Sequence, residues 1–215
     1  MSSFYQEFRY SSGENPSGKN DLELSAKIVH QIRKLGNIRT ICELGCGNGY
    51  FANQLSGLGY EVTGIDASES GIKYACENYG KNAEFIQAGI DHNLVQKVHG
   101  SQFDLVIAKE VIEHLYRPSD LMEGAKQLLK KDGYLCLTTP YHGYFKNLGI
   151  AILGRTDKHL NPLRECGHIK FFSVRTLSIL FAQAGFSNME FSFFGRVPLF
   201  WKSMICIAQN KSYAP

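Results

Sequence analysis

The chain has 215 residues, of which 44% are hydrophobic and 20% charged, and its formal net charge is +3. This composition is typical of a globular protein and excludes a disordered chain, a collagen-like fibre and a coiled coil. A charge so close to neutral disfavours a protein that binds nucleic acid with its whole surface. The length suits one α/β domain with embellishments, or at most two small domains, and we expect a single domain over residues 1–215.

Six cysteines are scattered without paired spacing, and several lie in apolar runs. This favours free thiols in a reducing compartment. The first ten residues lack the pattern of a secretory signal. No window approaches the roughly 18 consecutive apolar residues of a membrane span. We therefore expect a cytoplasmic protein.

Strand and helix patterns alternate along most of the chain. The polar residues 1–20 are expected to form a flexible arm. Helices are expected at residues 21–35, 50–58, 68–78, 91–98, 117–130 and 173–184. Strands are expected at residues 39–44, 61–65, 84–87, 103–108, 134–139, 189–194 and 202–209. Residues 141–168 lack clean periodicity and are expected to form an inserted substrate lid.

The first five strands alternate with helices, which predicts a parallel, doubly wound sheet with helices on both faces. The last two strands flank a tight connection at residues 195–198 and are expected to form an antiparallel hairpin. Such sheets bind ligands beyond the carboxyl ends of their strands. The residues that follow each strand are therefore the candidates for function.

A glycine-rich segment, ELGCGNG, occupies residues 43–49 between a strand and a helix. Its glycines permit a tight turn and let a ligand approach the backbone, although a plain tight turn is the alternative explanation. The third glycine comes one residue early for the dinucleotide pattern GxGxxG, which argues against an NAD-dependent dehydrogenase. Glu43 ends this strand and Asp66 ends the next. These acids favour a ligand that combines a positive charge with a ribose.

Three motifs in this order, ELGCGNG, GIDAS at 64–68 and FDLVIAKEVIEHL at 103–115, strongly resemble those of class I S-adenosylmethionine-dependent methyltransferases. The resemblance covers about residues 25–210. It implies a Rossmann-like, seven-stranded sheet, mostly parallel, with an antiparallel last strand. It also implies S-adenosylmethionine as the cofactor.

The resemblance implies a cofactor site made by the strand ends. Glu43 and Gly45 would lie near the methionine amino group, Asp66 would bind the ribose hydroxyls, and Ala67 would pack on the adenine. The cofactor-binding residues expected are Glu43, Gly45, Cys46, Gly47, Gly49, Asp66, Ala67, Gly89, Ile90, Asp91 and Lys109.

The adenine contact departs from the family pattern. Gly89 stands where many relatives carry an acid after the third strand. Either Asp91 takes over that contact or backbone groups around Ile90 make it.

Glu110, Glu113 and His114 fall at positions i, i+3 and i+4, which share one face of a helical turn. Together with His168 they form the candidate catalytic set and a candidate site for a divalent metal, Mg²⁺ in particular. Ubiquinone-biosynthesis O-methyltransferases carry a similar ExxEH with a downstream histidine. Small-RNA 3′-terminal 2′-O-methyltransferases use a similar set to hold magnesium. In the alternative without a metal, the acids are buried hydrogen-bond partners and His114 is a base or a packing residue.

Residues 141–175 carry a net charge of +4, whereas the whole chain carries +3. A basic lid favours an anionic acceptor or an anionic surface. Its interleaved apolar residues suit a short amphipathic helix that covers a pocket or makes peripheral contact with a membrane. The resemblance to ubiquinone-biosynthesis O-methyltransferases implies O-methylation of a small or lipid-like hydroxylated acceptor. The alternatives are an RNA 2′-O-methyltransferase, which the charge disfavours, and a non-catalytic cofactor-binding protein.

Overall fold

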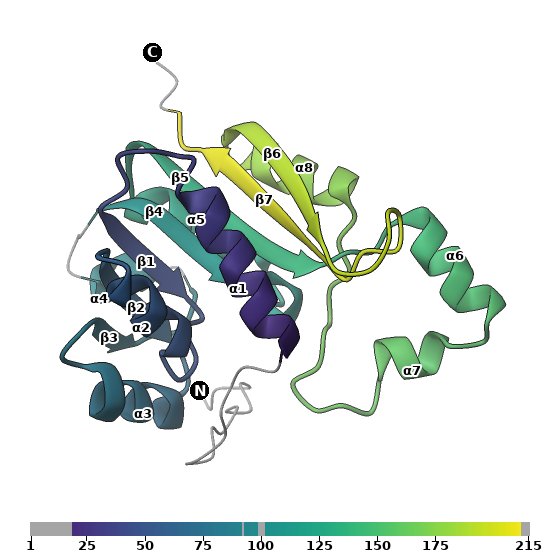
Figure 1. Ribbon diagram of the computed structural model, residues 1–215, viewed down its shortest axis with the longest axis horizontal. Coiled ribbons are helices and arrows are strands. Elements are labelled where there is room, and N and C mark those ends of the chain that lie inside the picture. The colour runs from purple at the N-terminus through teal and green to yellow at the C-terminus, as the bar shows by residue number, and fades with distance from the viewer. Residues whose placement is uncertain (1–18, 92, 99–101, 212–215) are drawn as a thin grey trace.

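The computed structural model describes residues 19–91, 93–98 and 102–211 (Figure 1). Its strands are β1 (Thr40–Leu44), β2 (Glu61–Asp66), β3 (Glu84–Gln87), β4 (Phe103–Lys109), β5 (Leu129–Pro140), β6 (Ser187–Phe194) and β7 (Ser203–Gln209). Its helices are α1 (Lys19–Ile32), α2 (Tyr50–Gly57), α3 (Glu69–Tyr79), α4 (Leu94–Lys97), α5 (Pro118–Leu128), α6 (Tyr144–Ile152), α7 (Thr156–Leu160) and α8 (Val174–Gln183), with a 3-10 turn, η1, at Ile112–His114.

The seven strands form one sheet in the order β3-β2-β1-β4-β5-β7-β6. The first five pair in parallel, and β7 pairs antiparallel with both β5 and β6. The expected Rossmann-like α/β fold, mostly parallel with an antiparallel last strand, is confirmed. The chain runs from β1 outward to β3 and then returns to β4, so β1 and β4 flank the point where the strand order reverses.

Alternation along the buried strands divides the core between the two faces of the sheet. In β4, Leu105 and Ile107 belong to a cluster that includes residues of α1 and α2. Val106 and Ala108 belong to a second cluster with residues of α4, α5 and α8. Both faces are therefore covered by helices, which is why the central strands read as continuous apolar runs.

The boundary between α5 and β5 differs from the sequence prediction. The helix expected over 117–130 ends at Leu128, and the strand begins at Leu129, five residues before the expected start. The Lys130 ammonium lies 2.8 Å from an Asp104 carboxylate oxygen, and Leu129 pairs with Phe103. These contacts with β4 outweigh the helix propensity of the leucines and lysines in this segment.

Two further predictions need correction. The helix expected over 91–98 is reduced to Leu94–Lys97. The Asp91 carboxylate accepts a hydrogen bond of 2.8 Å from the backbone N–H of Asn93, a local turn that competes with an earlier helical start. Of the flexible arm expected over 1–20, residues 1–18 lie outside the described residues, and Lys19 and Asn20 belong to α1.

The segment expected to form a lid contains two short helices, α6 and α7. Figure 1 shows them standing out beyond the carboxyl end of β5, away from the sheet. The described residues include no helix long and apolar enough to span a membrane. All six cysteines are free thiols, and four of them are buried.

Candidate active site

The glycine turn lies at the carboxyl end of β1, where the strand order reverses. Gly45 and Gly49 have φ angles of 74° and 78°. A Cβ on Gly45 would lie 2.4 Å from the Val111 side chain, and a Cβ on Gly49 would lie 2.7 Å from Phe85. The turn therefore needs glycine for both its backbone conformation and its close packing. The contact with Val111 also places the start of the ExxEH segment against this turn.

Asp66 at the end of β2 is held by the backbone around it. Its Oδ2 accepts a hydrogen bond of 2.8 Å from the N–H of Gly47, and its Oδ1 accepts one of 2.8 Å from the N–H of Ser68. Desolvation raises the pKa of Asp66, and these backbone hydrogen bonds act in the opposite direction. The carboxylate keeps further lone pairs for a ligand, because each of its oxygens can accept two hydrogen bonds.

Glu43 is a buried carboxyl group beside the glycine turn. Its Oε2 has no hydrogen-bond partner among the described residues. Burial raises its pKa to about 7, the Lys109 ammonium opposes this, and the negative charge of Asp66 adds to it. An unpartnered buried carboxylate is costly, and a cationic ligand would relieve that cost.

Lys109, expected at the cofactor, faces the N-terminal helix. Its ammonium lies 3.0 Å from the Asp21 carboxylate and 3.3 Å from the Ser25 hydroxyl, both on α1. It also lies 4.6 Å from the centre of the Phe51 ring. Lys109 therefore ties α1 to the end of β4, and its charge reaches the site through its effect on Glu43.

Gly89, Ile90 and Asp91 follow β3, the strand that pairs with β2. The backbone N–H of Ala88 donates a hydrogen bond of 2.9 Å to the carbonyl of Asp66. The structure therefore places this segment next to the expected ribose site. Asp91 is the acidic residue of this segment, and its carboxylate lies 3.9 Å from the Lys97 ammonium.

The two acids of the ExxEH segment do not share a helical face, which corrects the spacing argument. Glu110 precedes η1 and has a φ of 54°, a conformation that few non-glycine residues adopt. Thr138 donates a 3.0 Å hydrogen bond to Glu110, and Thr139 donates one of 3.0 Å to Glu113. Successive side chains of a strand point to opposite faces, so the end of β5 holds the two carboxylates apart.

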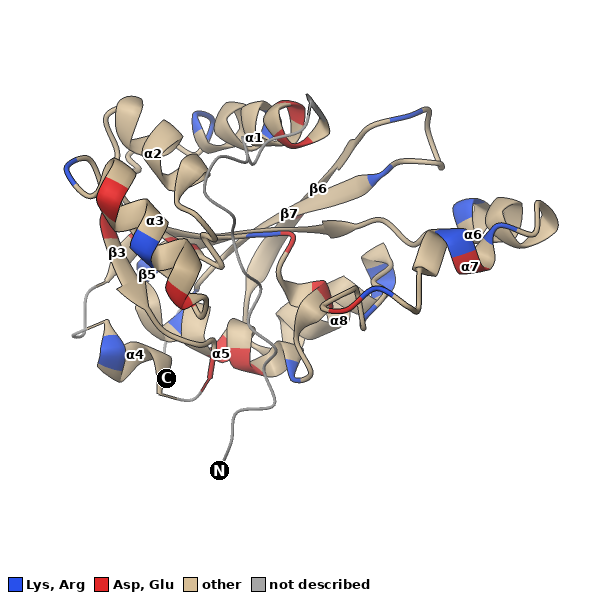
Figure 2. Cartoon of the chain, turned by 90° about the horizontal axis from the view of Figure 1, so that it is seen from below, with Lys and Arg blue, Asp and Glu red and all other residues tan. Residues whose placement is uncertain are grey.

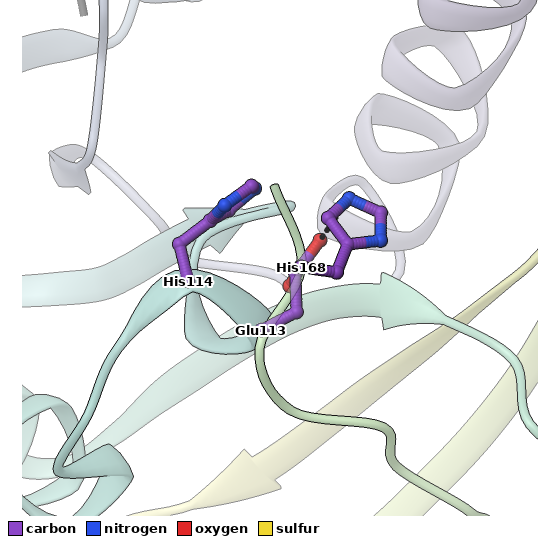
Figure 3. Close-up of side chains that lie close together, drawn as sticks. All are labelled: Glu113, His114 and His168. Atoms are coloured by element: carbon purple, nitrogen blue, oxygen red, sulfur yellow. Dashed lines mark ion pairs between the residues drawn. The ribbon is translucent and has the colours of Figure 1, made fainter. Parts of the chain in front are cut away.

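Glu113, His114 and His168 form one cluster (Figure 3). One potential ligand atom from each lies within 4.8 Å of the others, and among the described residues they are the only such group of three. His168 Nε2 lies 4.0 Å from Glu113 Oε1, which has no hydrogen-bond partner in the part of the chain that the structure describes. Three of the four residues expected as a catalytic and metal-binding set are thus brought together, and Glu110 is not.

Backbone contacts bring His168 to this cluster from 54 positions away in the chain. The carbonyl of Glu113 accepts hydrogen bonds of 2.9 and 3.0 Å from the N–H groups of Ile169 and Lys170. The carbonyl of Gly167 lies 3.1 Å from Nδ1 of His114. Because a carbonyl only accepts, Nδ1 carries the proton, and Nε2 of the neutral ring is left as an acceptor.

Burial and the neighbouring charges favour the neutral forms of the three side chains in this cluster. Desolvation raises the pKa of Glu113 well above its ordinary value, and the negative charge of Glu110 raises it further. Desolvation lowers the pKa of His168 to about 4, with the charge of His114 acting in the same direction, and it also lowers the pKa of His114. Neutral imidazoles can accept a proton or bind a metal. A cation between these groups would restore the charge of Glu113.

A cavity of about 170 Å³ adjoins the cluster and shares His168 with it. It is lined by Pro140, His142, Lys146, His159, His168, Phe171, Arg196 and Lys202. Most of these residues come from residues 141–168, the segment expected to form a lid, and from the connection between β6 and β7. From the sequence, Lys146 was expected only as one of the basic residues of 141–175, and neither Arg196 nor the two threonines were expected at the site. Thr138 and Thr139 could have been predicted as site residues, because they end a predicted strand and ligands bind beyond the carboxyl ends of such strands.

A family model described as a methyltransferase domain matches residues 12–190 of this chain. The chain belongs to this methyltransferase family. The expectation of an S-adenosylmethionine-dependent methyltransferase is thereby confirmed.

The methyltransferase is similar to curated enzymes named ubiquinone biosynthesis O-methyltransferase. It is 30% identical to the one from Ruegeria sp. over 168 residues, which are 75% of this chain and 66% of that protein. It is 26% identical to the one from Hydrogenovibrio crunogenus over 166 residues, which are 75% of this chain and 67% of that protein. The chain thus spans about two thirds of the length of these relatives.

Solved structures share the fold of this methyltransferase at low sequence identity. A SAM-dependent methyltransferase from Archaeoglobus fulgidus superposes with a TM-score of 0.67 at 18% identity, covering 89% of this chain and 95% of that one. Magnesium protoporphyrin IX methyltransferase from Synechocystis PCC 6803, with bound SAH, superposes with a TM-score of 0.63 at 22% identity, covering 88% and 82%. In this methyltransferase, the glycine turn and the Glu113 cluster lie at the carboxyl ends of the parallel strands of that shared sheet.

Proposed function

We propose that this methyltransferase transfers the methyl group of S-adenosylmethionine to a hydroxyl group of a small or lipid-like acceptor. The observation that carries the proposal is the cluster of Glu113, His114 and His168, with a buried carboxylate and two neutral imidazoles at one point. A hydroxyl is a weak nucleophile until its proton is removed, and this cluster supplies groups that can remove it.

The cofactor would lie on the glycine turn between the ends of β1 and β4. Glu43 would accept the methionine ammonium, because its Oε2 is buried and no described residue is its hydrogen-bond partner. Asp66 would accept the ribose hydroxyls, because the backbone already fixes its orientation through Gly47 and Ser68. The packing of Val111 on Gly45 supports a short path from the sulfonium to the cluster.

Methyl transfer is an in-line displacement, so the enzyme's main task is to position the acceptor oxygen behind the methyl group. The oxygen–methyl bond forms as the sulfur–methyl bond breaks, and the electron pair stays on sulfur. His114 is suited to take the hydroxyl proton at Nε2, because Nδ1–H is held by the Gly167 carbonyl. Glu113 would orient the acceptor hydroxyl through Oε1, because Thr139 already holds Oε2 of Glu113 by a hydrogen bond.

The cluster also fits a divalent cation. In this alternative, Glu113 Oε1, His114 and His168 would hold the cation, and His114 would bind it instead of taking the proton. Oε1 is buried and has no hydrogen-bond partner among the described residues. One carboxylate with two imidazoles suits Mn²⁺, Fe²⁺ or Zn²⁺ better than Mg²⁺, which prefers oxygen ligands. When bound, such a cation would lower the pKa of a coordinated hydroxyl.

The test is methyl transfer from S-adenosylmethionine to catechol, with a short RNA bearing a 3′-terminal diol as the comparison acceptor. We expect O-methylated catechol. Methylation of the RNA alone would show that the acceptor is an RNA and not a small molecule. If calorimetry detects no binding of S-adenosylmethionine, the central proposal is overturned. Activity is then measured after EDTA treatment and after adding Mg²⁺, Mn²⁺ or Zn²⁺. Turnover that EDTA leaves unchanged would exclude the metal.

The surface of the lid supports an acceptor with a lipid-like part. Phe145, Ile152 and Leu163 are 53%, 76% and 93% exposed. A contiguous patch of exposed apolar side chains marks an interaction surface, and we infer that these three residues of one segment contribute to such a patch. We expect the protein to sediment with vesicles of an anionic phospholipid, and the variant Ile152→Ser with Leu163→Ser to remain in the supernatant. Equal sedimentation of both would remove this support.

A further inference from the structure

Helix α6 is placed with its charge inside and its apolar residues outside. Lys146 is its one buried residue, only 3% exposed, whereas Tyr144, Phe145 and Ile152 are exposed. A lysine is almost never buried without a partner, because losing its hydration is costly. Packing alone gives no reason for this arrangement, since it exposes apolar side chains and buries a charged one.

The ammonium of Lys146 is incompletely satisfied. Among the described residues, its only hydrogen bond goes to the carbonyl of Tyr141, at 2.6 Å. An ammonium has three N–H donors, so two are left for a ligand. Desolvation lowers the pKa of Lys146 to about 8, and the positive charge of Arg196 contributes to this. The negative charge of Glu110 acts in the opposite direction, but Glu110 is hydrogen-bonded to Thr138 and does not line the cavity.

Other positive charges converge on the same cavity. Arg196 and Lys202 line it, together with Lys146, and no carboxylate of the described residues does. Figure 2 shows the corresponding basic segments on α6 and along the connection between β6 and β7. In the part of the chain that the structure describes, none of these three cations forms an ion pair with an acid. The Lys202 ammonium is instead 2.6 Å from the side-chain oxygen of Asn20.

We propose that this cavity is a subsite for an anionic group, a carboxylate or a phosphate, on the acceptor, with Lys146 and Arg196 as its principal ligands. Its role as part of the acceptor site rests on the proposed function. His168 lies on both the cavity and the Glu113 cluster, so an anion held by Lys146 would fix one end of an acceptor whose hydroxyl reaches the cluster. Lys146 and Arg196 would then be specificity-determining residues rather than catalytic ones.

The proposal is tested by binding, without cofactor or methyl transfer. Benzoate, inorganic phosphate and the neutral analogue benzamide are titrated separately into the protein. The side-chain NMR resonances of His142 and His159 report binding, because both residues line the cavity. We expect saturable shifts with benzoate or phosphate and none with benzamide. A response to benzoate alone identifies a carboxylate subsite, and a response to phosphate alone identifies a phosphate subsite.

Matched variants localise the effect. Lys146→Gln and Arg196→Gln should each weaken anion binding about tenfold or more, as expected for loss of one charge-assisted hydrogen bond. Arg155→Gln removes an exposed lid cation that does not line the cavity and should leave binding unchanged. Arg196 is exposed, so its variant decides the matter even if Lys146→Gln does not fold.

Three results would overturn the subsite: no saturable shift with either anion, an equal response to benzamide, or undiminished binding in the Arg196→Gln variant. Anion binding by a protein that shows no calorimetric binding of S-adenosylmethionine would instead retain the subsite and remove the proposed function. The two failures are therefore distinguishable.

Discussion

The backbone N–H of Gly47 donates a hydrogen bond of 2.8 Å to the Asp66 carboxylate, which joins the glycine turn after β1 to the end of β2. The two residues are 19 positions apart in the chain. The contact means that a single acid both shapes the turn and offers its remaining lone pairs to a ligand. A substitution at Asp66 therefore affects the local backbone as well as binding.

Replacing Asp66 by alanine should weaken binding of S-adenosylhomocysteine about 10- to 100-fold, because the charge-assisted hydrogen bonds to the ribose are lost. Asp66→Asn should retain part of the affinity, since an amide oxygen can still accept one of these bonds. Calorimetry measures both. The control is Asp132→Asn, an exposed position with a φ of 61° that asparagine tolerates. Unchanged affinity in Asp66→Ala would show that the ribose lies elsewhere.

Cofactor binding should release a proton from Glu43. Burial raises the pKa of this group to about 7 in the free protein, and an ammonium placed beside its carboxylate lowers that pKa. At pH 7 binding should therefore release about half a proton, with less released at higher pH, where Glu43 is already ionised. Affinity should fall as the pH drops below 7, because the protonated group must first lose its proton.

Calorimetry in buffers of different ionisation enthalpy counts the released protons. In Glu43→Gln this release should vanish, and the affinity should become independent of pH in the same range. If the variant still releases the proton, another group is responsible and Glu43 does not meet the ammonium.

Substitution of His114 by alanine should lower turnover about 10²- to 10⁴-fold, the usual contribution of a general base. The dissociation constant of S-adenosylhomocysteine should change little, because His114 lies on the proposed acceptor side. Radiolabelled methyl transfer and calorimetry separate the two effects. A parallel loss of cofactor binding would place His114 in the cofactor site instead.

Thr138 and Thr139 provide a matched pair for testing which carboxylate matters. Thr139→Val removes the 3.0 Å hydrogen bond to Glu113 and should lower turnover about tenfold by freeing that carboxylate. Thr138→Val removes the equivalent bond to Glu110, on the other face of β5, and should have a smaller effect. The reverse order would assign the main role to Glu110.

Asp104 should contribute acid-sensitive stability. Desolvation acts to raise its pKa, but hydrogen bonds from Lys130, Thr40 and Arg39 outweigh this and hold the pKa below its ordinary value. The contribution of Asp104 to the free energy of unfolding is therefore complete above the unfolded-state pKa of about 3.9, and it is lost as the pH falls below that value. Asp104→Asn should lower the free energy of unfolding by about 1–3 kcal/mol at pH 7, and the difference from wild type should shrink in acid.

Urea unfolding at several pH values measures this effect. The control is Glu61→Gln, which breaks the ion pair between Glu61 and Arg39. The Glu61 side chain is 61% exposed and the Arg39 side chain 79%. An exposed pair of this kind contributes little. Equal losses in the two variants would show that the hydrogen-bond network around Asp104 has no special role.

The helix and strand pattern was predictable because apolar periodicity and turn residues are local properties of the chain. Strand β3 matches its predicted limits, and α2 differs from its prediction by one residue at its end. The errors occur where distant residues intervene, as when contacts with Asp104 and Phe103 draw Lys130 and Leu129 into β5. Such contacts cannot be read from local propensity.

The sequence by itself determined the family, the sheet and the strand-end position of the glycine turn, Glu43 and Asp66, because these follow from motif order and from where parallel strands end. Only the tertiary structure decided which acids act together. The end of β5 places Thr138 and Thr139 on opposite faces, so Glu113 joins His114 and His168 while Glu110 is held apart. It also placed Lys146 inside the lid, because burial depends on the residues that surround a helix and not on the helix's own sequence.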